Sequence, residues 1–144
     1  MMITRAKPSD EDEIKDMLRS CLLPSEDLSS GLMDGFLVLR QAGALIGTVG
    51  LEKFGQVGLL RSLAVRGDSR GKSWGLQLTR QIEELARQHG LRELFLLTTT
   101  AEDFFTRQGY HIISREQAPA SIQDTAEFKS LCPSSAVLMH KTLS

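Results

Sequence analysis

Cysteine and histidine are scarce in this sequence of 144 residues, which has two cysteines and three histidines. Cys21 and Cys132 are too few for the disulfide framework of a small secreted domain, and they lack the paired spacing of a zinc site. His89 lies near an expected helix C-terminus, where an imidazole is favourable for structural reasons. His111 and His140 lie in or beside expected strands with no nearby acid in the sequence. We therefore expect reduced thiols, no bound metal and no catalytic histidine.

Long apolar runs are also missing. No stretch approaches the roughly 20 residues that a membrane span needs, and the first five residues lack the apolar core of a signal peptide. An excess of one charge is missing too, because 17 Lys and Arg face 18 Asp and Glu, a net charge of -1. The sequence predicts a cytoplasmic protein that binds neither nucleic acid nor membrane.

The chain reads as one domain over residues 1–144, since its four prolines and twelve glycines are scattered between periodic segments. The charges are distributed unevenly along it. Residues 1–34 carry four cationic and eight anionic side chains, whereas residues 53–92 carry eight cationic and three anionic ones, a local excess of +5 (8 − 3). A small anionic ligand is therefore expected to bind the middle of the chain.

Hydrophobic periodicity predicts an α/β fold of the mixed, α+β-like kind. Helical spacing of apolar residues favours helices over about 8–22 and 73–89, and a short helix is expected at 101–107. A cap at Ser25, with Glu26 and Asp27 in the first turn, favours a helix over 25–33. Strand patterns cover residues 3–5, 36–40, 44–52, 57–65, 93–98, 110–114 and 136–142. Short hairpin loops make the early strands antiparallel, and the helix at 73–89 joins two strands that can be parallel. We expect a central twisted mixed sheet of about seven strands with about four helices.

The segment between the buried strand at 57–65 and the next helix has the features of a phosphate-binding loop. A loop that enters a helix presents unpaired backbone N–H groups and the positive end of the helix dipole. Arg70 and Lys72 add positive charge there, and Trp74 can either cover a ligand or pack. The alternative is a solvated basic loop that only caps the helix.

This loop, Arg70-Gly71-Lys72-Ser73-Trp74-Gly75, resembles the R/Q-x-x-G-x-G/A motif of the GNAT acetyltransferases, and Leu63-Ala64-Val65 precedes it in the family's register. Ser73 stands where the family usually has glycine. The resemblance implies that acetyl-CoA is the cosubstrate, with its pyrophosphate on the loop. It also implies that the sheet splays between strands four and five, and that the cosubstrate pairs there with the backbone of Leu63 and Val65.

The segment from Ala101 to Tyr110 resembles the family's short helix that ends in G-F or G-Y. Many members have a tyrosine there that protonates the departing CoA thiolate, and this chain has Phe105 instead. Because a thiol has a pKa of about 8–9, water or another donor could serve. Phe105 is expected to contact the cosubstrate without acting as an acid.

Two closer resemblances narrow the acceptor. Residues 94–105 resemble bacterial N-acetylglutamate synthases. Motifs between residues 23 and 141 resemble the small N-acetyltransferases of arsenic-resistance operons; they include Leu23-Pro24, Gly50-Leu51-Glu52 and residues 59–65, 97–101 and 127–136. Both resemblances imply an α-amino acid, or a glutamate-like or arsenic-containing analogue, as the acceptor.

Arg61 and Glu52 are the expected catalytic residues. A charge on a buried strand is costly unless it is paired, so Arg61 either forms a salt bridge with Glu52 or clamps an acceptor carboxylate. Glu52, on the neighbouring strand, is the nearest candidate for a general base. Arg61, Ser62, Thr98, Thr99 and Cys132 are expected to contact the acceptor.

The sequence thus predicts an N-acetyltransferase that acts on the amine of a small molecule, with a homodimer as one option for its assembly. Residues 116–135 are long enough to fold over the acceptor side, which disfavours an open peptide groove. Two alternatives stay open, a peptide or lysine N-acetyltransferase and a non-catalytic acyl-CoA-binding module.

Overall fold

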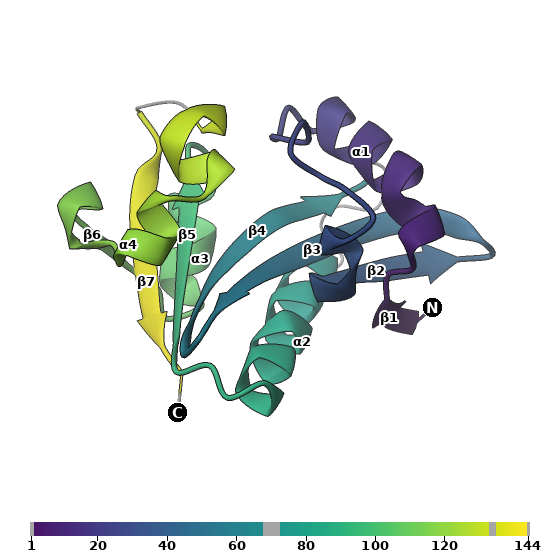
Figure 1. Ribbon diagram of the computed structural model, residues 1–144. Helices are drawn as coiled ribbons and strands as arrows, with labels where there is room; N and C mark the ends of the chain where they lie inside the picture. The colour runs from purple at the N-terminus through teal and green to yellow at the C-terminus, as the bar shows by residue number, and fades with distance from the viewer. Residues whose placement is uncertain (1, 68–72, 133–134, 144) are drawn as a thin grey trace.

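A computed structural model describes residues 2–67, 73–132 and 135–143. Seven strands form one sheet in the order β1-β2-β3-β4-β5-β7-β6, in which β4 and β5 are parallel and the other pairs are antiparallel (Figure 1). The strands are β1 (Met2–Arg5), β2 (Phe36–Gln41), β3 (Ala44–Phe54), β4 (Val57–Val65), β5 (Glu93–Thr98), β6 (His111–Ile113) and β7 (Val137–Thr142). The predicted mixed α/β class is confirmed.

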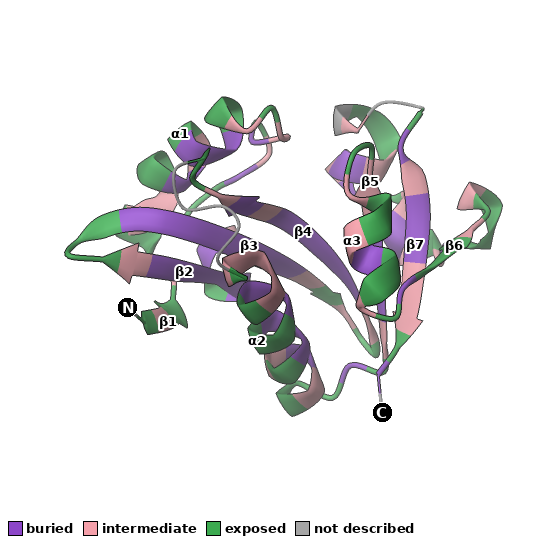
Figure 2. Ribbon diagram, turned by 180° about the vertical axis from the view of Figure 1, so that it is seen from behind, coloured by how far each residue is buried: buried purple, intermediate pink, exposed green. Residues whose placement is uncertain are grey.

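Helices cover both faces of this sheet. They are α1 (Glu11–Ser20), α2 (Trp74–Gln88), α3 (Glu102–Arg107) and α4 (Ala120–Gln123). Successive side chains of a strand point to opposite faces, so on β2 Leu37 and Leu39 pack with α2, whereas Phe36 and Val38 pack with α1. Figure 2 shows α2 and α3 on one face of the sheet, with α1 on the other.

The predicted helix at 25–33 is wrong. The chain there makes separate turns, in which the amides of Leu28, Leu32 and Met33 each bond the carbonyl three residues back, followed by a 3-10 turn at Leu32–Gly35. The physical reason is the run Ser29-Ser30-Gly31, whose residues favour turns over helix interior. Leu28 and Met33 are nevertheless buried in one cluster with Ile14, Met17 and Leu18 of α1, so packing fixes this segment without a helix.

Residues 115–131, which the sequence left without assigned elements, fold into three short pieces. These are a 3-10 turn at Arg115–Gln117, α4, and a π-helical turn at Glu127–Leu131. Ala118 and Ile122 pack on Leu59 and Phe95, which places the segment over the sheet beside β4 and β5. Arg115 fixes its last turn by donating to the carbonyl of Phe128.

The sheet opens between β4 and β5. Parallel pairing joins Val57, Gly58 and Leu59 to Glu93, Leu94 and Phe95. Beyond that point the two strands diverge, as Figure 1 shows, and among the described residues no strand pairs with the β5-facing edge of residues 60–64. The predicted splay is confirmed.

A β-bulge in β4 lies at the opening. The register with β3 shifts between Thr48↔Ala64 and Gly50↔Arg61, and Ser62 has a left-handed backbone with φ 59°. A bulge resets the alternation of a strand. As a result, Arg61 and Ala64 share the face of α1, whereas Leu63 turns to the face of α2.

Candidate active site

A cavity of about 670 Å³ lies in the gap between β4 and β5. Its walls come from β4, from the end of β5 and the turn after it, from the loop after α1, and from the residues around the π-helical turn. The lining residues are Leu60 to Ala64, Leu96 to Ala101, Cys21 to Pro24, Glu26, Phe105, Glu127, Cys132 and Ala136.

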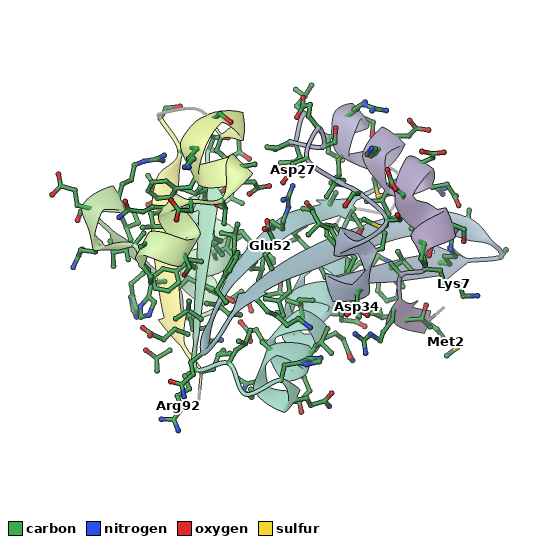
Figure 3. All side chains as sticks on the ribbon, in the orientation of Figure 1. Met2, Lys7, Asp27, Asp34, Glu52 and Arg92 are labelled. Atoms are coloured by element: carbon green, nitrogen blue, oxygen red, sulfur yellow. The ribbon has the colours of Figure 1, made fainter. Side chains whose placement is uncertain are left out.

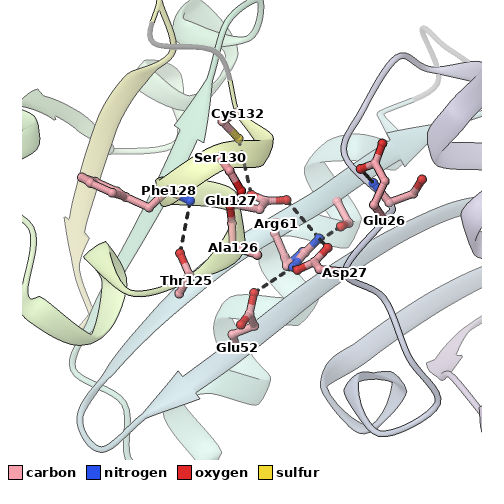
Figure 4. A network of polar contacts seen from close by, with 12 residues as sticks. Glu26, Asp27, Glu52, Arg61, Thr125, Ala126, Glu127, Phe128, Ser130 and Cys132 are labelled. Atoms are coloured by element: carbon pink, nitrogen blue, oxygen red, sulfur yellow. Dashed lines mark hydrogen bonds and ion pairs between the residues drawn. The ribbon is translucent and has the colours of Figure 1, made fainter.

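Arg61 is the centre of a polar cluster at the edge of this cavity (Figure 4). Its side chain is fully buried, and its Nη atoms contact Asp27 twice, at 2.5 and 2.7 Å, Glu52 at 2.8 Å and Glu127 at 3.2 Å. Nε donates to the hydroxyl of Ser62 at 3.1 Å. Four of these contacts are hydrogen bonds donated by the guanidinium, and the contact with Glu127 is an ion pair.

The three carboxylates of this cluster come from distant parts of the chain. Figure 3 labels Asp27 on the loop after α1 and Glu52 on β3; Glu127 begins the π-helical turn. The bonds from Arg61 lower the pKa of Asp27 even though burial opposes them. Glu127 is different, because burial, together with the charges of Asp27 and Glu52, raises its pKa to about 7 against the opposing effect of Arg61.

Cys132 lies against the same carboxylate. Its Sγ donates to Oε1 of Glu127 at 3.8 Å, and burial, together with the charge of Glu127, raises the pKa of the thiol to about 12. A thiol needs its ionised form to act as a nucleophile. Cys132 is therefore suited to line the cavity, not to carry an acetyl group.

The structure brings together the residues expected to contact the acceptor. Arg61, Ser62, Thr98, Thr99 and Cys132 all line the cavity. Arg61 has the internal salt bridge with Glu52 that the sequence offered as one of two arrangements. A clamp on an acceptor carboxylate would compete with the four hydrogen bonds and the ion pair that the guanidinium already makes.

The expected cosubstrate residues divide into three groups. Leu63 and Phe105 line the cavity, and Val65 ends β4 beyond the residues that line it. Ser73, Trp74 and Gly75 lie at the start of α2, where Ser73 has a left-handed backbone with φ 63° and Gly75 approaches Phe104. Arg70, Gly71 and Lys72 lie outside the described residues.

Sequence reasoning missed Asp27 and Glu127. Asp27 had been assigned to the first turn of the helix that does not form. Glu127 begins the segment 127–136, which entered the sequence analysis only through its resemblance to the small N-acetyltransferases of arsenic-resistance operons. A signal was present, since an arginine on a buried strand requires acids near it, but sequence spacing pointed only to the adjacent strand.

Other features of the described residues bear on the class of site. They contain no group of three or more His, Cys, Asp or Glu side chains arranged to hold a metal ion. None of their helices has the length and hydropathy to cross a bilayer.

A mixed sheet that splays between two parallel strands, with a cavity in the gap and a helix that starts after the first of them, defines the acetyltransferase fold that the sequence had suggested. The sequence profile of the acetyltransferase (GNAT) family matches residues 5–110. This chain belongs to that family.

Curated relatives are named amino-acid acetyltransferases. The protein of Ralstonia nicotianae is 31% identical over 108 residues, which cover 74% of this chain and 23% of the relative. That of Serratia proteamaculans is 34% identical over 80 residues, which cover 54% of this chain and 18% of the relative. The chain thus spans about a fifth of the length of these relatives.

Solved structures share the fold. One is the N-acetylglutamate synthase of Neisseria gonorrhoeae, complexed with coenzyme A and N-acetyl-glutamate. It superposes with a TM-score of 0.86 at 22% identity, and the aligned part covers 99% of this chain and 35% of the synthase chain. A Mycobacterium tuberculosis protein in complex with CoA and NLQ gives a TM-score of 0.84 at 22% identity, with 100% of both chains covered.

Proposed function

We propose that this chain transfers the acetyl group of acetyl-CoA to the amine of a small, amino-acid-like acceptor. The observation that carries the proposal is the cavity in the gap between β4 and β5, which is lined by Arg61 and Ser62 of the bulged strand, by Thr98 and Thr99 at the end of β5, and by Glu127 and Cys132. Membership of the GNAT family supports acetyl transfer as the chemistry.

The residues present fit acetyl-CoA as a substrate, which supplies an activated acetyl thioester. The edge of β4 at Leu63 faces the gap, and its backbone N–H groups are suited to polarise a thioester carbonyl. At the start of α2, the indole N–H of Trp74 is buried and has no hydrogen-bond partner among the described residues. A buried donor of this kind favours a ligand acceptor atom. Ser73 and Gly75 would hold the same end of the cosubstrate, with Arg70, Gly71 and Lys72.

A small acceptor is supported by how the cavity is covered. The loop at 21–27 lies on one side, and the turn at Glu127–Leu131 lies on the other. Arg61 joins the two, because it pairs with Asp27 of the loop and with Glu127 of the turn. This connection across the acceptor side favours a compact molecule over a peptide. The names of the curated relatives favour an amino acid.

Within this proposal, Ser62, Thr98, Thr99 and Cys132 contact the acceptor. Arg61 organises the three carboxylates and is a positioning residue. Glu52, which the sequence put forward as general base, is bonded to Arg61 and lines a separate hollow of about 190 Å³ on β3. Its role in this proposal is therefore to hold Arg61 in place. A glutamate-like or arsenic-containing acceptor is the finer form of the proposal, and it rests on the resemblance.

The test is amine-dependent release of CoA thiol from acetyl-CoA. The panel contains α-amino acids, glutamate and its phosphinic and arsenical analogues, polyamines and a lysine peptide. Turnover confined to small amino acids supports the proposal, and the preferred analogue defines the acceptor. Turnover with the peptide alone would overturn it, as would acetyl-CoA binding without turnover on any amine, which is the behaviour of a binding module.

A further inference from the structure

Glu127 differs from the other two carboxylates around Arg61 in its position. Glu127 lines the large cavity, whereas Asp27 and Glu52 are not among its lining residues. Its whole residue is only 3% exposed, so the carboxylate is enclosed beside the space that the acceptor is proposed to fill. Of the three acids, it is the one placed to touch an acceptor.

Glu127 is also the carboxylate that Arg61 holds least closely. Arg61 contacts Asp27 through two short bonds and Glu52 at 2.8 Å, but Glu127 at 3.2 Å. Within residues 2–67, 73–132 and 135–143, the other oxygen of Glu127 accepts only the weak thiol contact from Cys132 at 3.8 Å. Since a carboxylate offers about four acceptor positions, Glu127 retains capacity for a further donor.

The charge of the cluster favours a cation as that donor. Three carboxylates surround one guanidinium, so the cluster has one to two negative charges in excess, depending on whether Glu127 is protonated. The groups that face Glu127 are Arg61 from β4, Asp27 from the loop after α1, Glu52 from β3 and Cys132 from its own segment. Burial and the two acids raise the pKa of Glu127 to about 7, close to the value that suits a proton acceptor at neutral pH.

The geometry points to Glu127 as the group that takes the proton from the ammonium of the acceptor, with Arg61, Asp27 and Glu52 holding its carboxylate in place. This inference rests on the proposed function. An N–H bond of the ammonium breaks and an O–H bond forms on Glu127, which leaves a neutral amine. The amine lone pair forms the new N–C bond as the thioester C–S bond breaks. A second amine proton goes to the CoA sulfur, and Glu127 returns its proton to water.

The experiment compares wild type with Glu127→Gln across pH 6 to 9.5, with the preferred amine of the panel. Wild-type kcat/KM is expected to fall on the acidic side with an apparent pKa near 7. Glu127→Gln is expected to lose about 10²- to 10³-fold in kcat at pH 7.5. It is also expected to lose that acidic limb and to recover part of its rate at pH 9.5, where solvent deprotonates more of the amine.

Glu116→Gln is the matched control, because Glu116 is exposed on the same segment and lies outside the cavity lining. It should keep the wild-type profile. Acetyl-CoA affinity, measured by calorimetry, should be unchanged in both variants, and circular dichroism at 222 nm should show the same fold.

Failure of the proposed function and failure of the role of Glu127 give different results in this experiment. If wild type turns over no amine, the proposed function fails and this inference fails with it. If wild type is active and Glu127→Gln either keeps its rate or loses the same factor at every pH, the inference alone is overturned and Glu127 is a positioning residue.

Discussion

At Arg61, one guanidinium holds three acids whose positions in the chain are up to 100 residues apart, Asp27, Glu52 and Glu127 (127 − 27). Burying a charge is tolerated when its partners are buried with it, and removal of one partner leaves the others uncompensated. The side chain of Glu127 is only 5% exposed, and those of Asp27 and Glu52 are 18% and 15% exposed, so water replaces Arg61 poorly as a partner. Stability and catalysis therefore both depend on the charge balance of this cluster.

Removing Arg61 should destabilise the protein in a pH-dependent way. Arg61→Leu leaves three neighbouring carboxylates without their cation, so we expect a loss of about 3–5 kcal/mol in the free energy of unfolding at pH 8. The loss should be smaller at pH 5, where protonation relieves the repulsion. Urea unfolding at both pH values measures it. Arg107→Leu, on the exposed end of α3, is the control, and an equal loss at both pH values would contradict the expectation.

Replacing Glu127 should increase the free energy of unfolding, whereas replacing Arg61 should decrease it. Its folded-state pKa of about 7 lies above its ordinary value of 4.5, so the folded state binds the proton more tightly than the unfolded chain does. That contribution to stability is complete below pH 4.5 and is lost as the pH rises through 7.

Glu127→Gln is therefore expected to exceed wild type in stability by about 3 kcal/mol at pH 8. Near pH 4.5 the two proteins should be almost equal. Thermal denaturation across this range gives the comparison. A wild type more stable than the variant at pH 8 would show that the ionised carboxylate is favoured in the folded protein.

At the scale of elements, the start of α2 explains why glycine is common at the position of Ser73 in the motif. Ser73 is the residue before the helix and has φ 63°, a conformation that glycine adopts freely and side chains with a Cβ do not. Ser73 thus replaces the usual glycine at a position where the backbone has to be left-handed.

Substitutions at Ser73 should follow backbone strain. Ser73→Gly is expected to retain stability or gain up to about 1 kcal/mol, whereas Ser73→Val should lose about 1–2 kcal/mol because a β-branched residue is disfavoured at positive φ. Thermal unfolding tests both. If valine were tolerated as well as glycine, the left-handed conformation would not be required at this position.

The pairing of β2 with β3 contains a packing constraint of a different kind. A Cβ on Gly50 would lie 2.5 Å from the ring of Phe36, which is fully buried. Gly50→Ala should therefore cost about 1–3 kcal/mol through overpacking. Combining it with Phe36→Leu should cost less than the sum of the two single changes.

Gly31→Ala is the control for that cycle, since its Cβ would meet only an oxygen at 3.8 Å. Urea midpoints of the four proteins in the cycle give the coupling. Strict additivity would mean that the ring of Phe36 is not what excludes a side chain at position 50.

At the scale of the whole molecule, the sheet consists of two halves, β1–β4 and β5–β7, that pair through three residues on each side of the gap. The Arg61 to Glu127 contact also joins them. A ligand seated between the halves adds contacts to both, and a ligand that binds only the folded state stabilises it.

Coenzyme A should accordingly protect both sides of the gap. At 100 times its dissociation constant it is expected to raise the free energy of unfolding by about 2.7 kcal/mol. Hydrogen exchange should slow in residues 60–65 and in residues 96–101. Slowing in the α2 region alone would indicate binding at the start of the helix without entry into the gap.

Much of the fold could be predicted from the sequence because strand and helix periodicity is local. The seven strands and the helix at 73–89 followed from such patterns, and the splay followed from the resemblance. The helix at 25–33 failed because the cap-like residues Ser25, Glu26 and Asp27 are followed by Ser29-Ser30-Gly31, which favours turns over a helix interior. Asp27 and Glu127 could not be assigned to Arg61, since a contact between residues 34 or 66 positions apart leaves no periodic trace (61 − 27; 127 − 61).

The four charged residues of the Arg61 cluster also constrain how the sequence can diverge. Replacing Arg61 with an uncharged residue leaves up to three carboxylates without a cationic partner. The replacement is therefore tolerated only after some of Asp27, Glu52 and Glu127 have been replaced. The order in which substitutions arise at these positions therefore decides whether each of them is tolerated. Among related sequences, positions 27, 52, 61 and 127 should covary as one group, and an engineer who alters the acceptor specificity would have to redesign them together.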